Sequence, residues 1–273
     1  MECFYKITTY FSFVKAEPES TFFHTFAVVL SQFTHPVILT KFLSLHILKM
    51  DILNKEIISQ RLKGITESAT LEMTRRSREL KARGFDIINL SIGEPDFNTP
   101  DPVKEAAKEA IDNNITHYPP VAGFKILQEA IAEKLKRDNN LDFLPEQIVV
   151  SNGAKQSLAN IFLSILDPGD EVIITAPYWV SYADIIKLAG GKVVALQTSI
   201  EDDFKLNPEK LKAAINSKTK AFLFNSPSNP TGMVYTAEEI SGLVNVLKKH
   251  PDLLVVSDEI YEHINYSGKH VSI

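Results

Sequence analysis

A carboxylate at the end of an apolar run is the clearest sign of chemistry in this chain. Asp258 follows Leu253-Leu-Val-Val-Ser257, a segment too apolar to solvate a charge. Such a carboxylate needs a cation, a hydrogen-bond donor or a raised pKa. We expect Glu259 to point to the opposite side of an extended backbone, so the two acids do not form a general acid/base pair. Tyr261 adds a phenol that can donate to an oxygen anion.

A turn that can bind an anion lies earlier in the chain. Gly153, Ala154 and Lys155 stand in Ser151-Asn-Gly-Ala-Lys-Gln156, where a turn precedes a predicted helix. Free backbone amides and the helix dipole at such a place favour a phosphate. The segment lacks the Walker pattern, so spacing alone also allows an ordinary turn between a strand and a helix.

Two further segments carry groups that can hold a flat ring. Trp179 is the only tryptophan and follows Pro177-Tyr178, where its ring can cover one face of an aromatic ligand, although burial in the core is the simpler alternative. Asn229 lies in Ser226-Pro-Ser-Asn-Pro-Thr-Gly232, whose two prolines stiffen the loop. Turn formation explains the Pro and Gly residues, but not why this loop follows a buried strand.

Short apolar strands alternate with amphipathic helices and position these segments. We predict strands at 85–90, 147–150, 171–175, 193–196, 221–224 and 253–256, and helices at 68–83, 102–113, 124–137, 155–166, 182–188, 208–215 and 237–248. Such alternation requires crossover connections, which favours an α/β fold with a mostly parallel sheet and helices on both faces. Ligands of such sheets bind beyond the carboxyl ends of the strands, where all four segments fall.

The first forty-nine residues differ from the rest in composition, being rich in Phe, Ile, Leu, Val and His. The stretch 22–48 could be a membrane or signal segment, but His, Gln, Pro and Lys residues interrupt any apolar run of about 18 residues. We favour an over-called start, with Met50 as the true first residue. His24, His35 and His46 are too widely spaced for a metal site on one element.

Composition restricts the class of partner. The formal net charge is −5 and no long Lys/Arg cluster occurs, which argues against a nucleic-acid surface and favours small-molecule partners. Cys3 is the only cysteine, which excludes an internal disulfide and a thiolate metal site and favours the cytoplasm. We predict no metal site and no membrane association, apart from the doubt that the leader raises.

The motifs Asn225-Ser-Pro-Ser-Asn-Pro-Thr-Gly232 and Ser257-Asp-Glu-Ile-Tyr261 resemble those of fold-type I pyridoxal-phosphate aminotransferases. From about Leu53 to Ile273, the chain is similar to the bacterial aspartate/aromatic subgroup. The resemblance implies pyridoxal 5′-phosphate as the cofactor, an amino-acid and a 2-oxo-acid substrate, and a homodimer. It divides the chain into a doubtful leader (1–49), an N-terminal arm and small-domain segment (50–96), and a large cofactor-binding domain (97–273).

The same resemblance assigns roles to residues. It implies that Asp258 binds the pyridine nitrogen of the cofactor and keeps it protonated, that Asn229 and Tyr261 bind the phenolic oxygen, and that Trp179 stacks on the ring. The phosphate turn corresponds to Gly153, Ala154 and Lys155, and Tyr118 reaches the phosphate of the neighbouring subunit. Gly93, Trp179 and Asn229 line the substrate pocket.

Some family features depart or are missing. Ala154 stands where glycine is frequent, and Gln128 stands where arginine is usual. The Schiff-base lysine and the arginines that bind the phosphate and the substrate carboxylate would lie beyond Ile273, and Lys269 is too close to Asp258 to replace that lysine. Without that lysine, which is also the base of the reaction, we expect the chain to be inactive alone. We also expect it to be poorly soluble, because an edge of its sheet and an apolar face would be left uncovered.

Three classes of function remain open. The leading hypothesis is a fragment of an aminotransferase, best matched to aspartate transaminase. The alternatives are a non-catalytic cofactor-binding or subunit-interaction protein, and another fold-type I enzyme such as a C–S lyase. A dinucleotide-binding enzyme is disfavoured, because no Gly-x-Gly-x-x-Gly turn follows a predicted strand.

Overall fold

A parallel sheet organises the part of the chain that the computed structural model describes, which is residues 59–65, 69–90, 93, 97–266 and 268–273. Its four strands in these residues are β1 (Glu171–Ala176), β2 (Lys192–Gln197), β3 (Thr219–Asn225) and β4 (Leu254–Asp258). Their spatial order is β2-β1-β3-β4, and every neighbouring pair is parallel. The predicted α/β class with a parallel sheet is confirmed.

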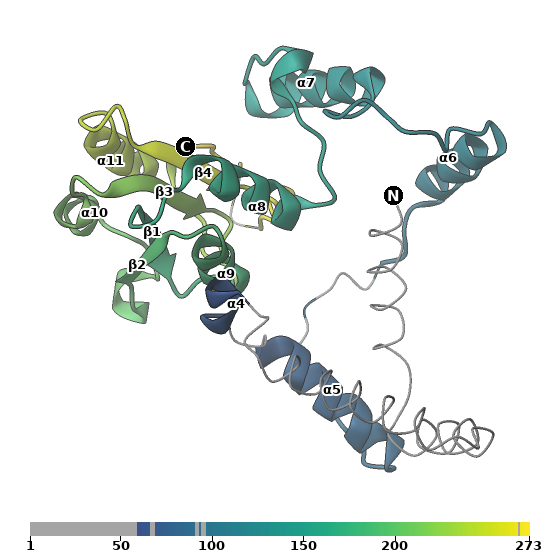
Figure 1. Cartoon of the computed structure of the whole chain (residues 1–273), viewed down its shortest axis with the longest axis horizontal. Helices are drawn as coiled ribbons and strands as arrows, with labels where there is room; N and C mark the ends of the chain where they lie inside the picture. Colours follow the sequence, from purple (N-terminus) through teal and green to yellow (C-terminus); the bar gives the residue numbers. More distant parts are fainter. Residues whose placement is uncertain (1–58, 66–68, 91–92, 94–96, 267) are drawn as a thin grey trace, which may run out of the picture. The chain divides into compact units, whose positions relative to one another are not determined.

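Helices precede the sheet and connect its strands (Figure 1). They are α4 (Gln60–Lys63), α5 (Ala69–Ala82), α6 (Asp101–Asp112), α7 (Lys125–Asn139), α8 (Ala154–Ile165), α9 (Ser181–Leu188), α10 (Pro208–Ala214) and α11 (Ala237–Leu247), with short 3-10 turns η1 (Pro145–Gln147) and η2 (Ile200–Asp202). The bounds of α5 to α11 agree with the predicted helices to within two residues, whereas α4 and the two 3-10 turns were not predicted.

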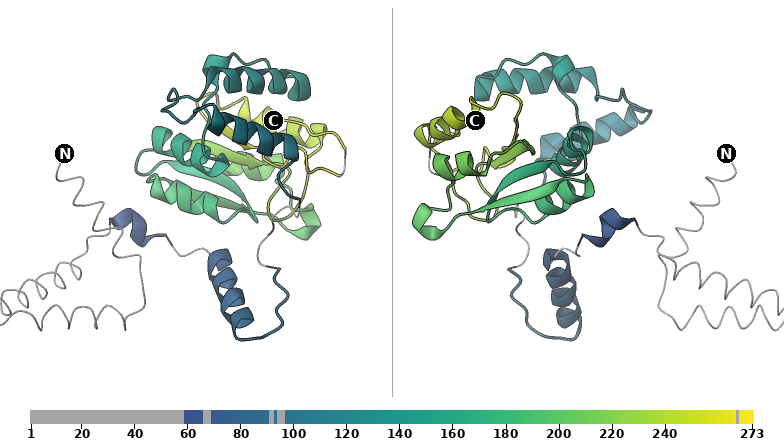
Figure 2. Two further views of the ribbon diagram at one scale, coloured as in Figure 1. Left: turned by 90° about the vertical axis from the view of Figure 1, so that its right-hand side faces the viewer. Right: turned by 60° about the vertical axis from the view of Figure 1, so that its left-hand side comes forward.

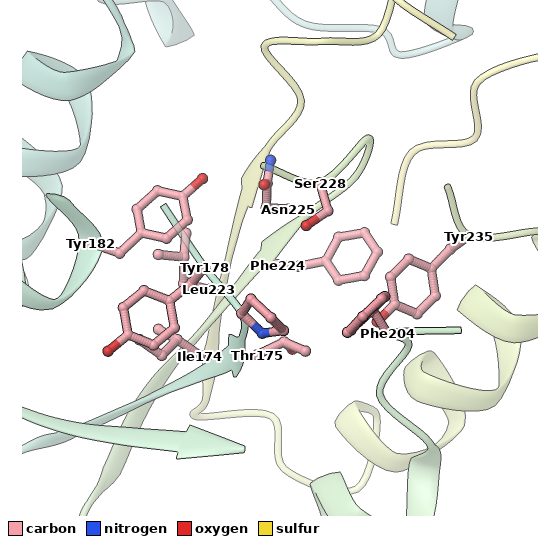
Figure 3. Close-up of a pocket in the computed structure, with 11 residues that line it drawn as sticks. Ile174, Thr175, Tyr178, Tyr182, Phe204, Leu223, Phe224, Asn225, Ser228 and Tyr235 are labelled. Carbon is pink, nitrogen blue, oxygen red and sulfur yellow. The ribbon is translucent and has the colours of Figure 1, made fainter. Parts of the chain in front are cut away.

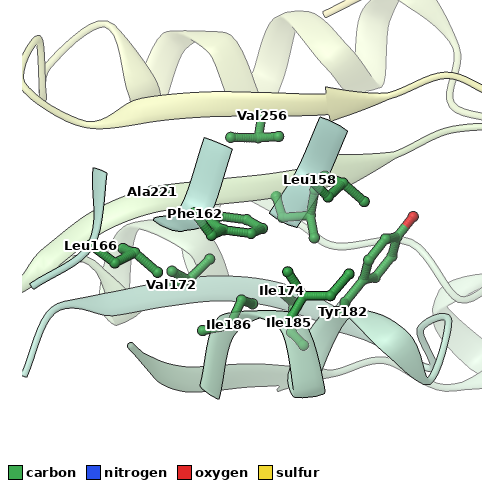
Figure 4. Close-up of a cluster of buried hydrophobic side chains, with 11 residues drawn as sticks. Leu158, Phe162, Leu166, Val172, Ile174, Tyr182, Ile185, Ile186, Ala221 and Val256 are labelled. Carbon is green, nitrogen blue, oxygen red and sulfur yellow. The ribbon is translucent and has the colours of Figure 1, made fainter. Parts of the chain in front are cut away.

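Alternate residues of the strands face opposite helix layers. On one face, Val172, Ile174 and Leu223 pack with residues of α8 and α9 such as Phe162 and Ile186 (Figure 4). On the other face, the neighbouring strand residues pack with α10 and α11; this second cluster includes Ile173, Phe222, Phe224, Leu211 and Leu243. The turned views show the sheet between these two pairs of helices (Figure 2). Covering both faces buries most of β1 and β3, as their continuous apolar sequences require, whereas Leu254 and Val255 of β4 remain exposed.

Local sequence fixes where the helices on the second face begin. The Asn207 side chain accepts a hydrogen bond from the Lys210 amide at the start of α10, and Pro208 occupies the first helical position. Thr236 and Glu239 form a reciprocal capping box at the start of α11. Both helices therefore begin at side chains that satisfy their own first amides.

Two predicted strands are wrong. Residues 85–90 form no strand, and Ile88 and Leu90 are 85% and 90% exposed. Residues 147–150 end a 3-10 turn and continue without a strand; the Val150 amide donates to the Ala122 carbonyl, which belongs to an irregular loop. Both segments have strand-like composition, but neither meets a strand with which it could form a ladder.

The predictions for residues 1–49, including the leader, Cys3 and the three histidines, lie outside the described residues. Within the described ranges, none of the helices is long and apolar enough to cross a membrane.

Candidate functional site

Asp258 is the last residue of β4, and it is buried, with 8% of its surface exposed. Its Oδ2 accepts a hydrogen bond from the Tyr182 hydroxyl at 2.7 Å, and its Oδ1 accepts one from the Ile260 amide at 3.2 Å. Burial, followed by the hydrogen bond and the charge of Asp258, raises the pKa of Tyr182 far above its usual value. Tyr182 therefore remains a proton donor to the carboxylate.

Trp179 joins this pair through Tyr182. The two rings meet edge to face, with centroids 5.4 Å apart and planes at 87°. The Lys155 ammonium lies 4.8 Å from the centroid of the Trp179 ring, so α8 brings its first turn to the same place. Asp258 of β4 and Trp179 of the loop after β1 thus both contact the same tyrosine.

Asn225 connects the loop after β3 to β4. It pairs with Asp258 in the register of the sheet, and its Nδ2 donates to the Asp258 carbonyl at 2.8 Å. Its Oδ1 accepts from the Asn229 amide at 2.9 Å. Asn229 in turn donates from Nδ2 to the Tyr261 hydroxyl oxygen at 3.4 Å. These contacts bring Asn229 and Tyr261 together at the end of the sheet that carries Asp258.

The turn at residues 151–156, predicted to bind an anion, has a backbone conformation that favours glycine at Gly153. Gly153 has φ +82°, a conformation that favours glycine, and α8 begins at the next residue, Ala154. The Asn152 amide donates to Gln156 Oε1 at 2.5 Å, which holds the turn against the helix. The first amides of a helix have no partner within it, so this turn can present donors to an anion.

A small cavity lies beside these residues (Figure 3). It has a volume of about 20 Å³, and its lining includes Tyr178, Tyr182, Asn225, Ser228 and Tyr235. That volume holds about one water molecule. A pyridine ring does not fit inside it, so a ring held by Asp258 must lie outside this cavity.

Two of the predicted site residues are not joined to this cluster in the described part of the chain. Tyr118 is fully exposed, at 104%, and the space around a side chain placed at Gly93 is open. Their proposed roles, toward a neighbouring subunit and toward substrate, stay predictions.

Sequence reasoning missed two residues of the cluster, Tyr182 and Asn225. Tyr182 was expected only as the start of a helix, and Asn225 only as the start of a loop. Their positions just beyond the carboxyl ends of β1 and at the end of β3 were the signal that could have identified them.

The chain from residue 86 to residue 273 matches the model of the aminotransferase class I and II family. The chain belongs to this aminotransferase family. It is 51% identical over 211 residues to the aspartate/prephenate aminotransferase of Nitrosomonas europaea, covering 77% of this chain and 53% of that relative. It is 52% identical over 217 residues to the aspartate aminotransferase of Bacillus subtilis, covering 79% and 55%.

Solved structures of aspartate aminotransferases are also similar to this chain. An aspartate aminotransferase from Thermus thermophilus with maleate matches with a TM-score of 0.76 and 47% identity, over 79% of this chain and 56% of that one. The chain therefore spans about half the length of the aminotransferases that it matches.

Aminotransferases of this family use pyridoxal 5′-phosphate, and the described residues fit that group chemically. Asp258 is a buried anion with lone pairs left over after its two donors, which suits a pyridinium N–H. The Tyr261 oxygen already accepts from Asn229, so the hydroxyl hydrogen is available for a phenolic oxygen. The turn at Gly153 suits a phosphate.

Proposed function

We propose that this chain supplies the cofactor-binding part of an aspartate aminotransferase, which transfers an amino group from an L-amino acid to a 2-oxo acid. The observation that carries the proposal is the buried Asp258 carboxylate with Tyr182 and Trp179 beside it. A buried carboxylate held by donors is the group that keeps a pyridine nitrogen protonated. The aspartate aminotransferases among the relatives support the choice of substrate class.

In the proposed site, each residue has one task. Asp258 holds a proton at the ring nitrogen, Asn229 and Tyr261 bind the phenolic oxygen, and Trp179 covers the ring. Gly153, Ala154 and Lys155 form the phosphate-binding turn at the start of α8, where the Ala154 and Lys155 amides are the donors, since the Gly153 amide donates to the Ser151 carbonyl. When bound, pyridoxal phosphate withdraws electrons from the substrate's Cα, and a protonated ring nitrogen strengthens that effect.

The proposal extends to assembly, substrate contacts and location. Tyr118 is fully exposed, which suits a residue that reaches a second copy of the chain in a homodimer. Gly93, Trp179 and Asn229 are proposed to lie near the substrate. Cys3 is the only cysteine, which is consistent with a reducing compartment such as the cytoplasm.

A ligand titration tests the proposed site. The probe is 4′-deoxypyridoxine 5′-phosphate, which carries the ring, the phenolic oxygen and the phosphate but cannot react with lysines. Because Trp179 is the only tryptophan, quenching of its fluorescence reports a ring bound against it. Replacement of Asp258 by Asn removes a charged partner and should weaken binding by roughly tenfold or more.

Asp252→Asn is the matched control, because Asp252 is exposed and its loss changes the net charge equally. Binding to this control should equal binding to the unsubstituted chain. Absence of quenching, or equal affinity for the Asp258→Asn chain, would contradict the proposed site.

A further inference from the structure

Glu262, the residue after Tyr261, makes polar contacts with two side chains of α7 and with the exposed His263, whose Nε2 lies 3.3 Å from Glu262 Oε1. Glu262 forms an ion pair with Lys134 through Oε1 and accepts a hydrogen bond from Asn139 Nδ2 through Oε2 at 2.7 Å. Lys134 also donates to Asn139 Oδ1 at 2.8 Å. The three side chains therefore satisfy one another, although Glu262 is more than 120 residues from its partners along the chain.

The electrostatics show that Glu262 is held as an anion. Its side chain is only 17% exposed, and burial by itself favours the neutral acid. The hydrogen bond from Asn139 and the charge of Lys134 outweigh burial and lower the pKa of Glu262. Displacement of this carboxylate would remove the acceptor of Asn139 Nδ2 and the anionic partner of Lys134, which would keep only Asn139 Oδ1 as its acceptor.

Backbone hydrogen bonds connect the segment around Glu262 to Tyr261. The Glu262 amide donates to the Glu259 carbonyl at 2.9 Å, and the Ile264 amide donates to the Tyr261 carbonyl at 2.8 Å. Tyr261 thus lies in a hydrogen-bonded turn with β4 on one side and the anchored Glu262 on the other. The position of the phenol depends on both ends of that turn.

Helix α7 is held at its other end as well. Gln128 donates from Nε2 to the Ile148 carbonyl at 2.6 Å, shortly before the Gly153 turn. No residue of α7 is fully buried, and Ile131, Ala132 and Leu135 are half-buried, so polar contacts add to a partly covered apolar face in connecting the helix to its surroundings. One helix therefore braces the segment before the phosphate turn and the turn that carries Tyr261.

We infer that Glu262, fixed by Lys134 and Asn139 of α7, is a positioning residue that holds the Tyr261 hydroxyl where it can donate to the phenolic oxygen of the cofactor. The inference rests on the proposed function, since it assigns Glu262 a task in the same site. Glu262 touches neither cofactor nor substrate in this account and acts only through Tyr261.

A double-mutant cycle tests the inference on the full chain, with 4′-deoxypyridoxine 5′-phosphate as the probe. Glu262→Gln should weaken binding by about fivefold to tenfold, the loss expected for one misplaced hydrogen bond. In a Tyr261→Phe background the same change should have no further effect, because the group through which Glu262 acts is gone. Glu133→Gln, an exposed charge change on α7, is the control that should leave binding unchanged.

A second readout does not need the ligand. Glu262→Gln should speed hydrogen exchange at the Ile264 amide, whereas Glu133→Gln should not. Lys134→Met removes the partner of Glu262 instead and replaces Glu262→Gln if that variant folds poorly. It should show the same weaker binding of the probe and the same faster exchange at the Ile264 amide. The inference would be overturned if Glu262→Gln weakened probe binding equally in the unsubstituted and the Tyr261→Phe chains. Unchanged probe binding in the Glu262→Gln chain would also overturn it.

The two proposals fail differently. If the unsubstituted chain does not bind the probe, the proposed function and the cofactor role of Tyr261 both fail. If the unsubstituted and Glu262→Gln chains bind it equally, the inference about Glu262 alone is overturned and the proposed function stands.

Discussion

The Tyr182 hydroxyl and the Asp258 carboxylate form a buried pair, with the donor and acceptor oxygens 2.7 Å apart. The donor comes from the first turn of α9 and the acceptor from the last residue of β4. A carboxylate in this position would otherwise be poorly solvated. The pair therefore explains how an anion is kept at the end of an apolar strand.

Tyr182→Phe removes that donor and leaves the buried carboxylate with fewer partners. We expect the free energy of unfolding to fall by about 1–3 kcal/mol, measured by urea denaturation at neutral pH. Tyr266→Phe is the matched control, because Tyr266 is 96% exposed, and its effect should stay within about 0.5 kcal/mol. Equal effects of the two substitutions would show that the hydrogen bond contributes nothing to stability.

A second prediction concerns the close approach of Gly123 to Val150. A Cβ at Gly123 would lie 2.6 Å from Val150 Cγ2, and φ at Gly123 is +106°. Gly169 has nearly the same φ, +104°, but open space around its Cβ position. Gly123→Ala should therefore destabilise the chain by about 1–3 kcal/mol more than Gly169→Ala, because it adds a steric clash to the same backbone strain.

Val150→Gly separates the two costs in the Gly123→Ala chain, because it removes both Val150 Cγ2 and Val150 Cβ, which would lie 2.6 Å and 2.8 Å from the added Cβ. Measured in that background, the added cost of Gly123→Ala should approach that of Gly169→Ala. The free energies of unfolding of these chains are the measurement. A Gly123→Ala chain no less stable than the Gly169→Ala chain would contradict the contact.

Tyr235 gives the chain a specific sensitivity to alkali. Burial raises the pKa of Tyr235 to about 12, above a value of about 10 for an unfolded tyrosine. A raised pKa in the folded state contributes stability that is fully present below pH about 10. That contribution is lost as the pH rises toward 12, by up to about 1.4 kcal/mol per pH unit.

Tyr235→Phe tests this dependence. At neutral pH the variant should lose about 1–3 kcal/mol, because the Leu206 amide donates to the Tyr235 oxygen at 2.7 Å and would lose its acceptor. The difference between the two chains should then shrink above pH 10, where only the unsubstituted chain loses the contribution of Tyr235. A difference that stays constant from pH 8 to pH 12 would contradict the assignment.

The strands of the sheet could be predicted because each carries its own evidence. Segments such as Glu171–Ala176 and Thr219–Asn225 are apolar, bounded by helices and buried on both faces, so periodicity and composition identify them. The 85–90 and 147–150 segments have similar composition but lack a neighbouring strand. Pairing is a long-range property, and a local pattern does not contain it.

The residues of the candidate site also fall into those that local sequence indicates and those that depend on distant partners. Asp258, Asn229, Tyr261, Trp179 and Lys155 could be selected as candidates because they follow predicted strands and carry distinctive chemistry. For Tyr182 and Asn225 the sequence offers only their positions after predicted strands, and their contacts could not be predicted because the partner of both, Asp258, is 76 and 33 residues away along the chain. The contacts of Glu262 with α7 were hidden for the same reason.

The protonation state of the bound ring reports whether Asp258 faces the pyridine nitrogen of the cofactor. The measurement is the ¹⁵N chemical shift of the ring nitrogen of ¹⁵N-labelled 4′-deoxypyridoxine 5′-phosphate, bound to the full chain and followed with increasing pH. The account predicts that the nitrogen stays protonated to a higher pH than in the free ligand, and that Asp258→Asn removes this difference. A bound nitrogen that titrates as it does in free solution, or that behaves identically in the Asp258→Asn chain, would contradict it.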